Sequence, residues 1–287
     1  MEYNFSNDLM SIREILNLSQ EDLAYELSVE QVTISKNESG EVRPSAKMLE
    51  DVYSFAFKEK IRINKIKEML ARDDLKKNEK LLFHGSKSGI QGCLNIKKGR
   101  KNNDFGQGFY VGENYEQAVS FISNFEDSSV YCMSFVDENL TCKKYEVDQD
   151  WMMTIAYYRG ALDEYSNHHI IQKLIKESKN CDYIIAPIAD NRMFQIINSF
   201  INGEITDEQC KHCLAATNLG MQYIFKSERS IAQLKLIERC YISKEERKYY
   251  KTKRQEESKL GEDKVKLARK QYRGKGRYID EILGGLV

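Results

Sequence analysis

The chain has 287 residues, 41% of them hydrophobic and 10% aromatic, and its 44 Lys and Arg residues balance 44 Asp and Glu residues. Such a length allows one or two domains with a buried core, and the apolar content excludes an intrinsically disordered chain. No apolar run is long enough to span a membrane, and the polar N-terminus lacks the form of a signal peptide. We therefore expect a soluble, cytoplasmic protein.

The seven cysteines are odd in number and have no framework spacing, so we expect reduced thiols rather than a disulfide scaffold. Cys210 and Cys213 have the Cys-x-x-Cys spacing of two zinc ligands, but no second pair follows at the spacing of a zinc finger. On a helix, His168 and His169 point about 100 degrees apart, which disfavours a shared metal. We expect no metal site.

The net charge of zero conceals a gradient along the chain. Residues 1–58 carry five bases and eleven acids, a net charge of −6, whereas residues 243–287 carry 14 bases and eight acids, a net charge of +6. The two ends are therefore expected to attract different partners.

Residues 1–58 have the pattern of four short helices. Apolar residues recur at helical spacing from Leu9 to Leu16, and residues 19–22, Ser-Gln-Glu-Asp, have the form of a capping box that opens a second helix. Ser28 predicts a turn, and a third helix is expected over residues 30–38 with Gly40 ending it. Residues 44–45, Pro-Ser, open a fourth helix.

The sequence Leu-Ser-Gln-x-x-Leu-Ala, followed by Ile-Ser-x-x-Glu-x-Gly and Pro-Ser, resembles the helix-turn-helix domain of the lambda-repressor and Cro type (XRE). The resemblance implies that Gln20 contacts the DNA backbone and that Glu38 is structural. It also implies that the groove-facing side of the third helix carries Gln31, Thr33, Ser35 and Lys36. Because this unit is acidic, two roles remain open: binding of a DNA operator, and dimerisation or docking of a partner protein.

Residues 59–80 form a charged connector that favours a helix. Its apolar face is expected to pack on a neighbouring part of the chain and contains Ile61, Ile63, Ile66, Met69 and Leu70. From residue 81 to 242, strand-like and helix-like segments alternate. The predicted strands cover residues 81–84, 108–112, 130–136, 141–147, 182–188, 222–225 and 233–242. The predicted helices cover residues 115–124, 151–159, 168–177, 192–202 and 207–216. This order predicts an α+β fold with a split, mostly antiparallel sheet.

Residues 243–287 predict a charged helical tail. Its Glu residues favour an ordinary surface helix. The alternative is a surface that holds a nucleic acid through its cations and tyrosines, namely Lys251, Lys253, Arg254, Arg269, Lys270, Arg273, Lys275, Arg277, Tyr249, Tyr250 and Tyr272.

Two short segments carry the main functional signal. Residues 81–86, Leu-Leu-Phe-His-Gly-Ser, predict a strand that delivers a histidine. Residues 104–110, Asp-Phe-Gly-Gln-Gly-Phe-Tyr, predict a glycine-rich turn that enters a strand with a tyrosine. Together the segments resemble the NAD-binding half of the ADP-ribosyltransferase fold, in the branch related to diphtheria toxin and the poly(ADP-ribose) polymerases.

A wider block is similar to DUF3990, a bacterial family of unknown function placed among the ADP-ribosyltransferases. The resemblance covers about residues 81–236 and adds Arg100, Gln117-Ala118, the segment Asp-Tyr-Ile-Ile at 182–185 and the segment Gln-Tyr-Ile-Phe at 222–225. It implies NAD as a substrate and a domain of that fold between the helix-turn-helix and the tail.

Cleavage of NAD at its nicotinamide bond requires a grip on the dinucleotide and stabilisation of an oxocarbenium-like ribose. By the resemblance, His84 bonds a ribose hydroxyl, Tyr110 stacks on nicotinamide and Arg100 meets the pyrophosphate. The other residues that it implies around NAD are Gly85, Ser86, Asp104, Phe105, Gly106, Gly108, Phe109 and Tyr115. A second aromatic ring is expected beside nicotinamide, with Phe109, Tyr115 and Phe121 as open alternatives.

A purely structural interpretation competes with this site. In it, His84 merely lies at a strand end, the two glycines shape a hairpin, and Asp104 caps that hairpin. The motif as a whole, at its expected spacing, favours NAD binding.

In the His-Tyr-Glu enzymes a third residue on a late strand bonds the nicotinamide ribose, and the matching position here is Gln222. A glutamine can hydrogen-bond a ribose but is neutral and cannot act as a general base. This departure favours single transfer over polymer elongation. Asp190, Glu113 and Glu116 are alternative acids.

We therefore expect a mono-ADP-ribosyltransferase fused to a helix-turn-helix unit, acting as a toxin or phage-defence effector under control of a neutralising partner protein or its own promoter. The acceptor is a protein or a nucleic acid. Two other readings are a transcriptional regulator with a non-catalytic NAD or nucleotide sensor, and an interaction module that does not bind NAD.

Overall fold

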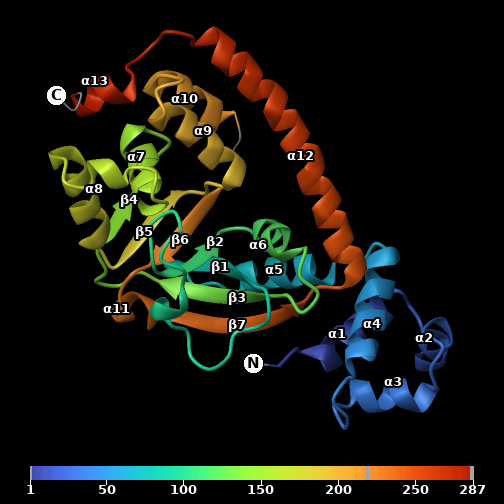
Figure 1. The fold of residues 1–287 in the computed structure, drawn as a ribbon. Coiled ribbons are helices and arrows are strands. Elements are labelled where there is room, and N and C mark those ends of the chain that lie inside the picture. The colour runs from blue at the N-terminus through green and yellow to red at the C-terminus, as the bar shows by residue number, and fades with distance from the viewer. Residues whose placement is uncertain (1, 217–219, 285–287) are drawn as a thin grey trace. The chain divides into compact units, whose positions relative to one another are not determined.

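The computed structural model describes residues 2–216 and 220–284 (Figure 1). The chain divides into two compact units that interleave along the sequence. The first unit comprises Met1–Gln91, Asn114–Phe135 and Lys235–Lys253, and the second comprises Gly92–Glu113, Val136–Leu234 and Arg254–Val287. In the described part of the chain, no helix combines the length and apolar character needed to cross a membrane. The sequence-based domain limits at residues 58, 80 and 242 remain predictions.

The first unit begins with a bundle of short helices. These are α1 (Phe5–Ile15), α2 (Gln20–Glu26), α3 (Gln31–Glu38), α4 (Ala46–Lys58) and α5 (Ile63–Asp73). The expected capping box is present, because the Ser19 side chain accepts a bond from the Asp22 N–H and the Asp22 side chain accepts one from the Ser19 N–H. The Ser45 side chain caps α4 by accepting a bond from the Met48 N–H. The four helices predicted before residue 58 are confirmed.

Part of the connector's apolar face packs on the helical bundle as predicted. Ile61 and Ile63 are buried in the core of the helical bundle, as expected of its apolar face. Met69 and Leu70, however, are 60% and 58% exposed, so the expectation is wrong for these two residues. The helix α5 ends at Asp73, and a strand has begun by Glu79.

The rest of the first unit is a group of strands with one covering helix. The strands are β1 (Glu79–Ser86), β3 (Ser129–Val136) and β7 (Leu234–Tyr241), in the order β1-β3-β7. Helix α6 (Tyr115–Ile122) packs on β1, where a Cβ on Gly85 would lie 2.7 Å from the Ala118 carbonyl oxygen. Helix α12 (Lys244–Gln271) starts in this unit.

A buried polar cluster joins the helical bundle to the strands within the first unit. Asp8 on α1 is 3% exposed and accepts hydrogen bonds from the Tyr53 hydroxyl and the Lys67 ammonium. Lys67 Nζ also lies 2.7 Å from Glu238 Oε1 on β7. Burial raises the pKa of Asp8, and the Lys67 charge acts in the opposite direction. The helix-turn-helix helices therefore share one interior with β7.

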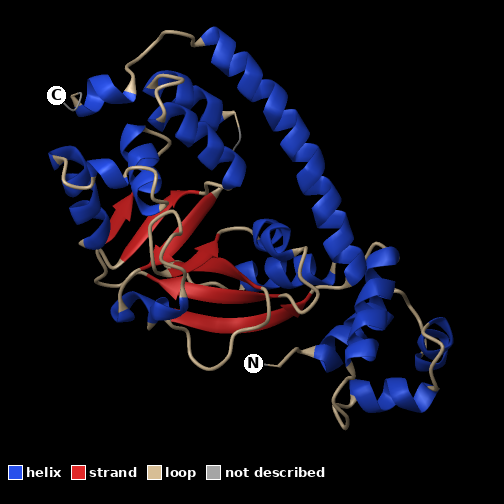
Figure 2. Cartoon of the chain, viewed as in Figure 1, coloured by secondary structure: helices blue, strands red, loops and turns tan. Residues whose placement is uncertain are grey.

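The second unit has four strands covered by helices (Figure 2). The strands are β2 (Phe109–Gly112), β4 (Cys142–Lys144), β5 (Tyr183–Pro187) and β6 (Met221–Phe225), in the order β4-β5-β6-β2. The β5–β6 and β6–β2 pairs are antiparallel, whereas β4–β5 is parallel. All seven predicted strands are present, and β4 is shorter than its prediction.

The helices of the second unit bury one face of these strands. They are α7 (Gln149–Tyr158), α8 (His169–Lys179), α9 (Asn191–Ile201), α10 (Asp207–Ala215) and α13 (Ile279–Leu283). The unit also contains the short helix α11 (Glu228–Ile231) and the 3-10 turns η1 (Ile96–Lys98) and η2 (Asp163–Tyr165). Trp151, Ile197 and Phe200 from the helices form one core with Ile184 and Ile224 from the strands. The expected α+β class is confirmed.

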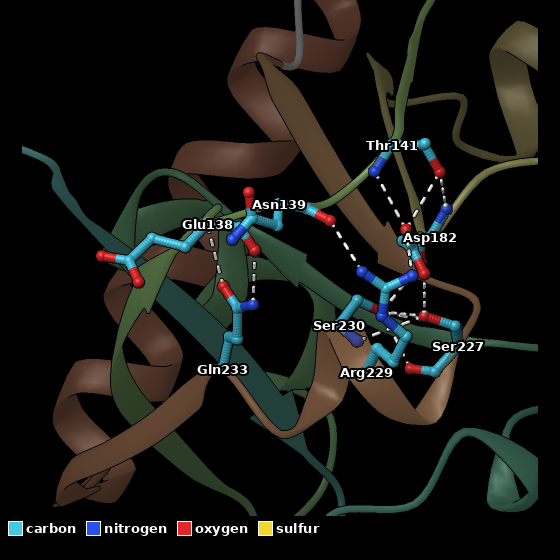
Figure 3. Close-up of polar contacts among 8 residues, drawn as sticks. All are labelled: Glu138, Asn139, Thr141, Asp182, Ser227, Arg229, Ser230 and Gln233. Atoms are coloured by element: carbon cyan, nitrogen blue, oxygen red, sulfur yellow. Dashed lines mark hydrogen bonds and ion pairs between the residues drawn. The ribbon is translucent and has the colours of Figure 1, made fainter.

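A polar network surrounds Asp182, which directly precedes the first residue of β5 (Figure 3). Its Oδ2 accepts bonds from the Thr141 N–H at 2.9 Å and hydroxyl at 3.0 Å, and its Oδ1 accepts one from Ser227 Oγ at 2.6 Å. Arg229 Nη1 lies 4.0 Å from Asp182 Oδ2, and Arg229 Nη2 donates to the Asn139 carbonyl. The Ser227 hydroxyl, the Thr141 N–H and hydroxyl, and the Arg229 charge together hold the pKa of Asp182 below its usual range.

This network predicts an acid-sensitive contribution to stability. The charged Asp182 is favoured in the folded chain, so its stabilisation is present above the unfolded pKa of about 4 and is lost as the pH falls through the lower folded pKa. We expect Asp182→Asn to reduce the free energy of unfolding by about 1–3 kcal/mol at pH 7 and by much less near pH 3. Urea unfolding at both values measures this. The control Glu138→Gln removes an exposed charge nearby, and an equal loss for Asp182→Asn at both pH values contradicts the prediction.

Candidate functional site

The glycine-rich turn before β2 is fixed by packing. Gly106 has φ +72°, and a Cβ there would lie 2.8 Å from the ring of Tyr158. A Cβ on Gly108 would lie 2.9 Å from the Phe225 carbonyl oxygen on β6. Both glycines therefore allow the backbone to pack closely, on α7 and on β6 respectively.

Tyr110 holds this turn through its hydroxyl. The hydroxyl donates to the Gly106 carbonyl at 2.7 Å and accepts from the Phe105 N–H at 3.1 Å. Its half-buried ring packs against the core of the second unit, and burial raises its pKa above the ordinary tyrosine range. Tyr110 is thus a neutral side chain with an anchored hydroxyl and a fixed ring orientation.

Lys226, directly after β6, forms hydrogen bonds with the backbone of the same turn. Its Nζ donates to the Phe105 carbonyl at 2.5 Å and to the Gln107 carbonyl at 2.9 Å. Burial lowers the pKa of Lys226 to about 8. Because a lysine and a tyrosine both anchor the backbone between residues 105 and 107, the turn is held rigid in advance of any ligand.

A buried carboxylate lies at the start of the turn. Asp104 is 6% exposed, and Arg159 Nε donates to its Oδ1 at 2.9 Å. Gln222 Nε2 donates to Asp104 Oδ2 at 3.0 Å and to the Pro187 carbonyl at 3.2 Å. Arg159 Nη2 also donates to the Ala189 carbonyl at 2.8 Å. Asp104 thus ties together the turn, the end of α7 and β6.

The strand register explains why Tyr110 and Gln222 belong together. Tyr110 lies opposite Ile224, and Gly112 lies opposite Gln222. Opposed residues and residues two apart share a face of a sheet, so Tyr110 and Gln222 lie on the same face. The fold therefore gathers Asp104, Tyr110 and Gln222, which the sequence separates by up to 118 positions.

The other predicted residues of the second unit have varied surroundings. Phe105 is fully buried, with its ring 5.0 Å from that of Tyr145, and Phe109 is 9% exposed. Arg100 is exposed in the loop before the turn. Of the alternative acids in this unit, Glu113 accepts a bond from the Tyr223 hydroxyl at 3.0 Å, whereas Asp190 caps α9 through the Met193 N–H.

The remaining predicted residues lie in the first unit. His84, Gly85 and Ser86 are half-buried at the end of β1. Tyr115 is fully buried and donates its hydroxyl to Glu246 Oε1 at 3.0 Å. Its ring therefore presents no surface to a ligand here, while Phe121 is 40% exposed. The third alternative acid, Glu116, accepts a bond from Lys253 Nζ at 2.9 Å.

Sequence reasoning missed Arg159 and Lys226. Each follows directly after an element, α7 and β6 respectively, where a charged residue is ordinary. Their partners are 55 positions away for Arg159 and 121 and 119 positions away for Lys226. No local pattern connects residues at such separations, so only the fold reveals them.

In the helix-turn-helix, a buried carboxylate on α3 joins this helix to α1 and α2 by hydrogen bonds. Glu38 is 8% exposed and accepts bonds from Arg13 Nε at 2.7 Å and from Gln20 Nε2 at 2.6 Å. Gln31 Nε2 donates to Gln20 Oε1 at 2.6 Å. The expected structural role of Glu38 is confirmed, and Gln20 positions the start of α3.

The outer side of α3 carries little net positive charge. Gln31 and Lys36 are exposed, whereas Thr33 and Ser35 are half-buried. Lys36 Nζ lies 3.5 Å from Glu41 Oε1, which offsets part of the single positive charge of this helix. Polar groups rather than net charge are therefore what this helix offers to DNA.

The comparisons with known proteins agree with two of the resemblances. A helix-turn-helix family model (HTH_3) matches residues 9–52, which lie within the stretch from α1 to α4 and support a DNA-binding regulatory unit. A second model, described as a protein of unknown function (DUF3990), matches residues 81–236. No curated protein and no solved structure matches the chain. Because the second match covers more than half of the chain, this protein belongs to the DUF3990 family.

Proposed function

We propose that this protein is an NAD-dependent mono-ADP-ribosyltransferase joined to a DNA-binding regulatory unit. One observation carries the proposal: Gln222 Nε2 lies 3.0 Å from Asp104 Oδ2, on the strand face that also carries Tyr110. Asp104 belongs to the glycine-rich motif and Gln222 to the late-strand motif, and the resemblance places both motifs in an NAD site. The two side chains are hydrogen-bonded to each other. A functional site built from distant segments has this character.

The chemistry asks for positioning more than for acid or base catalysis. Nicotinamide leaves as a neutral molecule, so the enzyme must hold its ring and stabilise the positive charge that develops on the ribose. In this proposal Tyr110 stacks on nicotinamide. The turn held by Tyr110 and Lys226 needs no reordering when NAD binds, which favours catalysis by preorganisation.

Gln222 has a specific place in this scheme. Its amide nitrogen is committed to Asp104 and Pro187, which leaves its carbonyl oxygen to accept a bond from the ribose. A glutamate at this position would bring a second carboxylate within hydrogen-bond distance of Asp104. The neutral amide is therefore matched to its surroundings. It supports single transfer, with deprotonation of the acceptor assigned to another group or to the substrate.

A second function is favoured by the same residue. Since Gln222 supplies no base and its donors are engaged within the protein, the site is also suited to bind NAD or another nucleotide without cleaving it. The protein is then a transcriptional regulator with a nucleotide sensor. Nicotinamide release separates the two functions.

For the biological role, we propose action in the cytoplasm as a toxin or phage-defence effector. Support comes from the helix-turn-helix unit, which is typical of proteins that bind an operator. In this role its activity is controlled by a neutralising partner protein or through the operator of its own promoter.

The role of Tyr110 is tested by a pair of variants. We expect Tyr110→Ala to reduce nicotinamide release from labelled NAD by at least about 100-fold, because both the stacked ring and the anchor of the turn are lost. Tyr110→Phe keeps the ring and loses the anchor, so a loss of about tenfold is expected. Tyr223→Phe removes a hydroxyl on the opposite face and serves as the matched control.

The same assay decides between the functions. If the wild-type protein binds NAD by calorimetry and releases no nicotinamide, the sensor replaces the transferase. Absence of both binding and release rejects both. Full activity of Tyr110→Ala contradicts the assigned site.

The match between Gln222 and Asp104 predicts a pH-dependent cost for a carboxylate at this position. In Gln222→Glu, burial and the charge of Asp104 both raise the pKa of the new carboxyl in the folded chain. The loss of unfolding free energy is therefore absent below the unfolded pKa of about 4. It grows as the pH rises, until the pH passes the raised pKa of the folded chain. We expect a loss of about 2 kcal/mol in unfolding free energy at pH 8 and little loss at pH 4. Urea unfolding measures it, with the exposed Gln255→Glu as control. A pH-independent loss refutes the explanation.

DNA binding is tested on α3. We expect Lys36→Gln to weaken binding to all duplex sequences and to lower the salt slope by about 1, since it removes one phosphate contact. Gln31→Ala is expected to reduce discrimination between operator and random duplex. Operator fragments are selected from genomic DNA and measured by fluorescence anisotropy. Lys47→Gln, an exposed lysine on α4, is the control, and equal behaviour of both lysine variants removes α3 from the DNA interface.

A further inference from the structure

A cluster of positive charge lies directly before the glycine-rich turn. Residues 97–101, Lys-Lys-Gly-Arg-Lys, contain four cations, and the sequence has no acidic residue between positions 92 and 103. The four charged residues, Lys97, Lys98, Arg100 and Lys101, are all exposed. We call this segment the basic loop. The functional site described above uses only Arg100 from it.

The backbone of the basic loop is fixed by its neighbours. Gln107 Nε2 donates to the Lys97 carbonyl at 2.7 Å and to the Gly99 carbonyl at 3.1 Å. Asn95 Oδ1 accepts from the Lys97 N–H at 2.7 Å. A Cβ on Gly99 would lie 2.2 Å from the Gly108 carbonyl oxygen, so the loop packs backbone to backbone on the turn. Its cations are consequently presented to solvent from a preformed scaffold.

The number of cations indicates the ligand. The pyrophosphate of a dinucleotide carries two negative charges, and one arginine with one lysine satisfies them. Four adjacent cations exceed this need and suit a chain of phosphates. The basic loop contains no aromatic residue and so offers no stacking platform for bases. It is therefore built to bind a backbone without reading its sequence.

Three cations of the C-terminal tail have partners within the protein. Within the second unit, Arg254 pairs with Asp190 at 3.8 Å and Arg269 Nη2 donates to Ser199 Oγ at 2.9 Å. In the first unit, Lys253 donates to Glu116. These three residues of the expected nucleic-acid surface thus hold α12 in place.

We propose that the basic loop binds the phosphate backbone of a single-stranded nucleic acid. The choice of a single strand rests on the proposed function, because transfer to a base requires that base to be unpaired and accessible. Binding itself is independent of NAD. The inference assigns the acceptor class of the transferase to nucleic acid.

The test measures binding of the full-length protein to fluorescent 20-nucleotide RNA and DNA single strands, without NAD, over a range of salt concentrations. With all four cations changed to Gln, we expect binding at 100 mM salt to weaken at least about tenfold and the salt slope to fall by about 3. The pairs Lys97→Gln with Lys98→Gln, and Arg100→Gln with Lys101→Gln, are each expected to give about half of this change in slope. The control changes four exposed lysines of α12 to Gln, namely Lys259, Lys264, Lys266 and Lys270.

The outcomes are distinct. A loss confined to the basic-loop variants supports the proposal. An equal loss in the α12 control shows a general charge effect, and a loss only in that control assigns the strand to the tail; both overturn it. Absence of strand binding by the wild-type protein also overturns it. Because NAD is absent, a failed transferase assay leaves this result unaffected, and melting temperatures of all variants verify that they are folded.

Discussion

The arrangement of the second unit depends on one buried carboxylate. Asp104 is neutralised by Arg159 and hydrogen-bonded by Gln222, so it joins a turn, the end of a helix and a strand. Removing one partner of a buried ion pair leaves an uncompensated charge and typically costs about 3–5 kcal/mol. The glycine-rich turn begins at this anchor, and the basic loop packs on that turn through Gly99 and Gln107. The proposed site therefore rests on buried polar contacts.

A second buried charge organises the first unit. Asp8, shared between Tyr53 and Lys67, brings α1, α4 and α5 together, and the contact of Lys67 with Glu238 extends the cluster to β7. Tyr241 on β7 adds to this joint, since its ring lies 5.1 Å from that of Tyr53 and its carbonyl accepts a bond from Asn64. The helix-turn-helix helices therefore share an interior with β7. Such a shared core gives a physical basis for linking DNA binding to the state of this unit.

Much of the fold was predictable because its signals are local. The capping box at Ser19, the turn at Gly40 and the apolar runs of the seven strands each depend on neighbours a few residues away. The packing of the connector was predicted only in part. Periodicity shows which residues form a face but not where that face stops being covered, and Met69 and Leu70 are exposed. For the site, the motifs identified Asp104, Tyr110 and Gln222, whereas Arg159 and Lys226 have no local signature.

By itself, the sequence determined the α+β class, the helix-turn-helix and the membership of the DUF3990 family, since these depend on residue order and short-range pattern. Only the tertiary structure decided which side chains satisfy one another. It assigned the Tyr110 hydroxyl to the turn and enclosed Tyr115 in the core. It also gave Gln222 a reason to be neutral, through a carboxylate 118 positions earlier. The physical reason is that burial makes an unpaired polar group costly, and the partner that removes this cost is chosen by proximity in space.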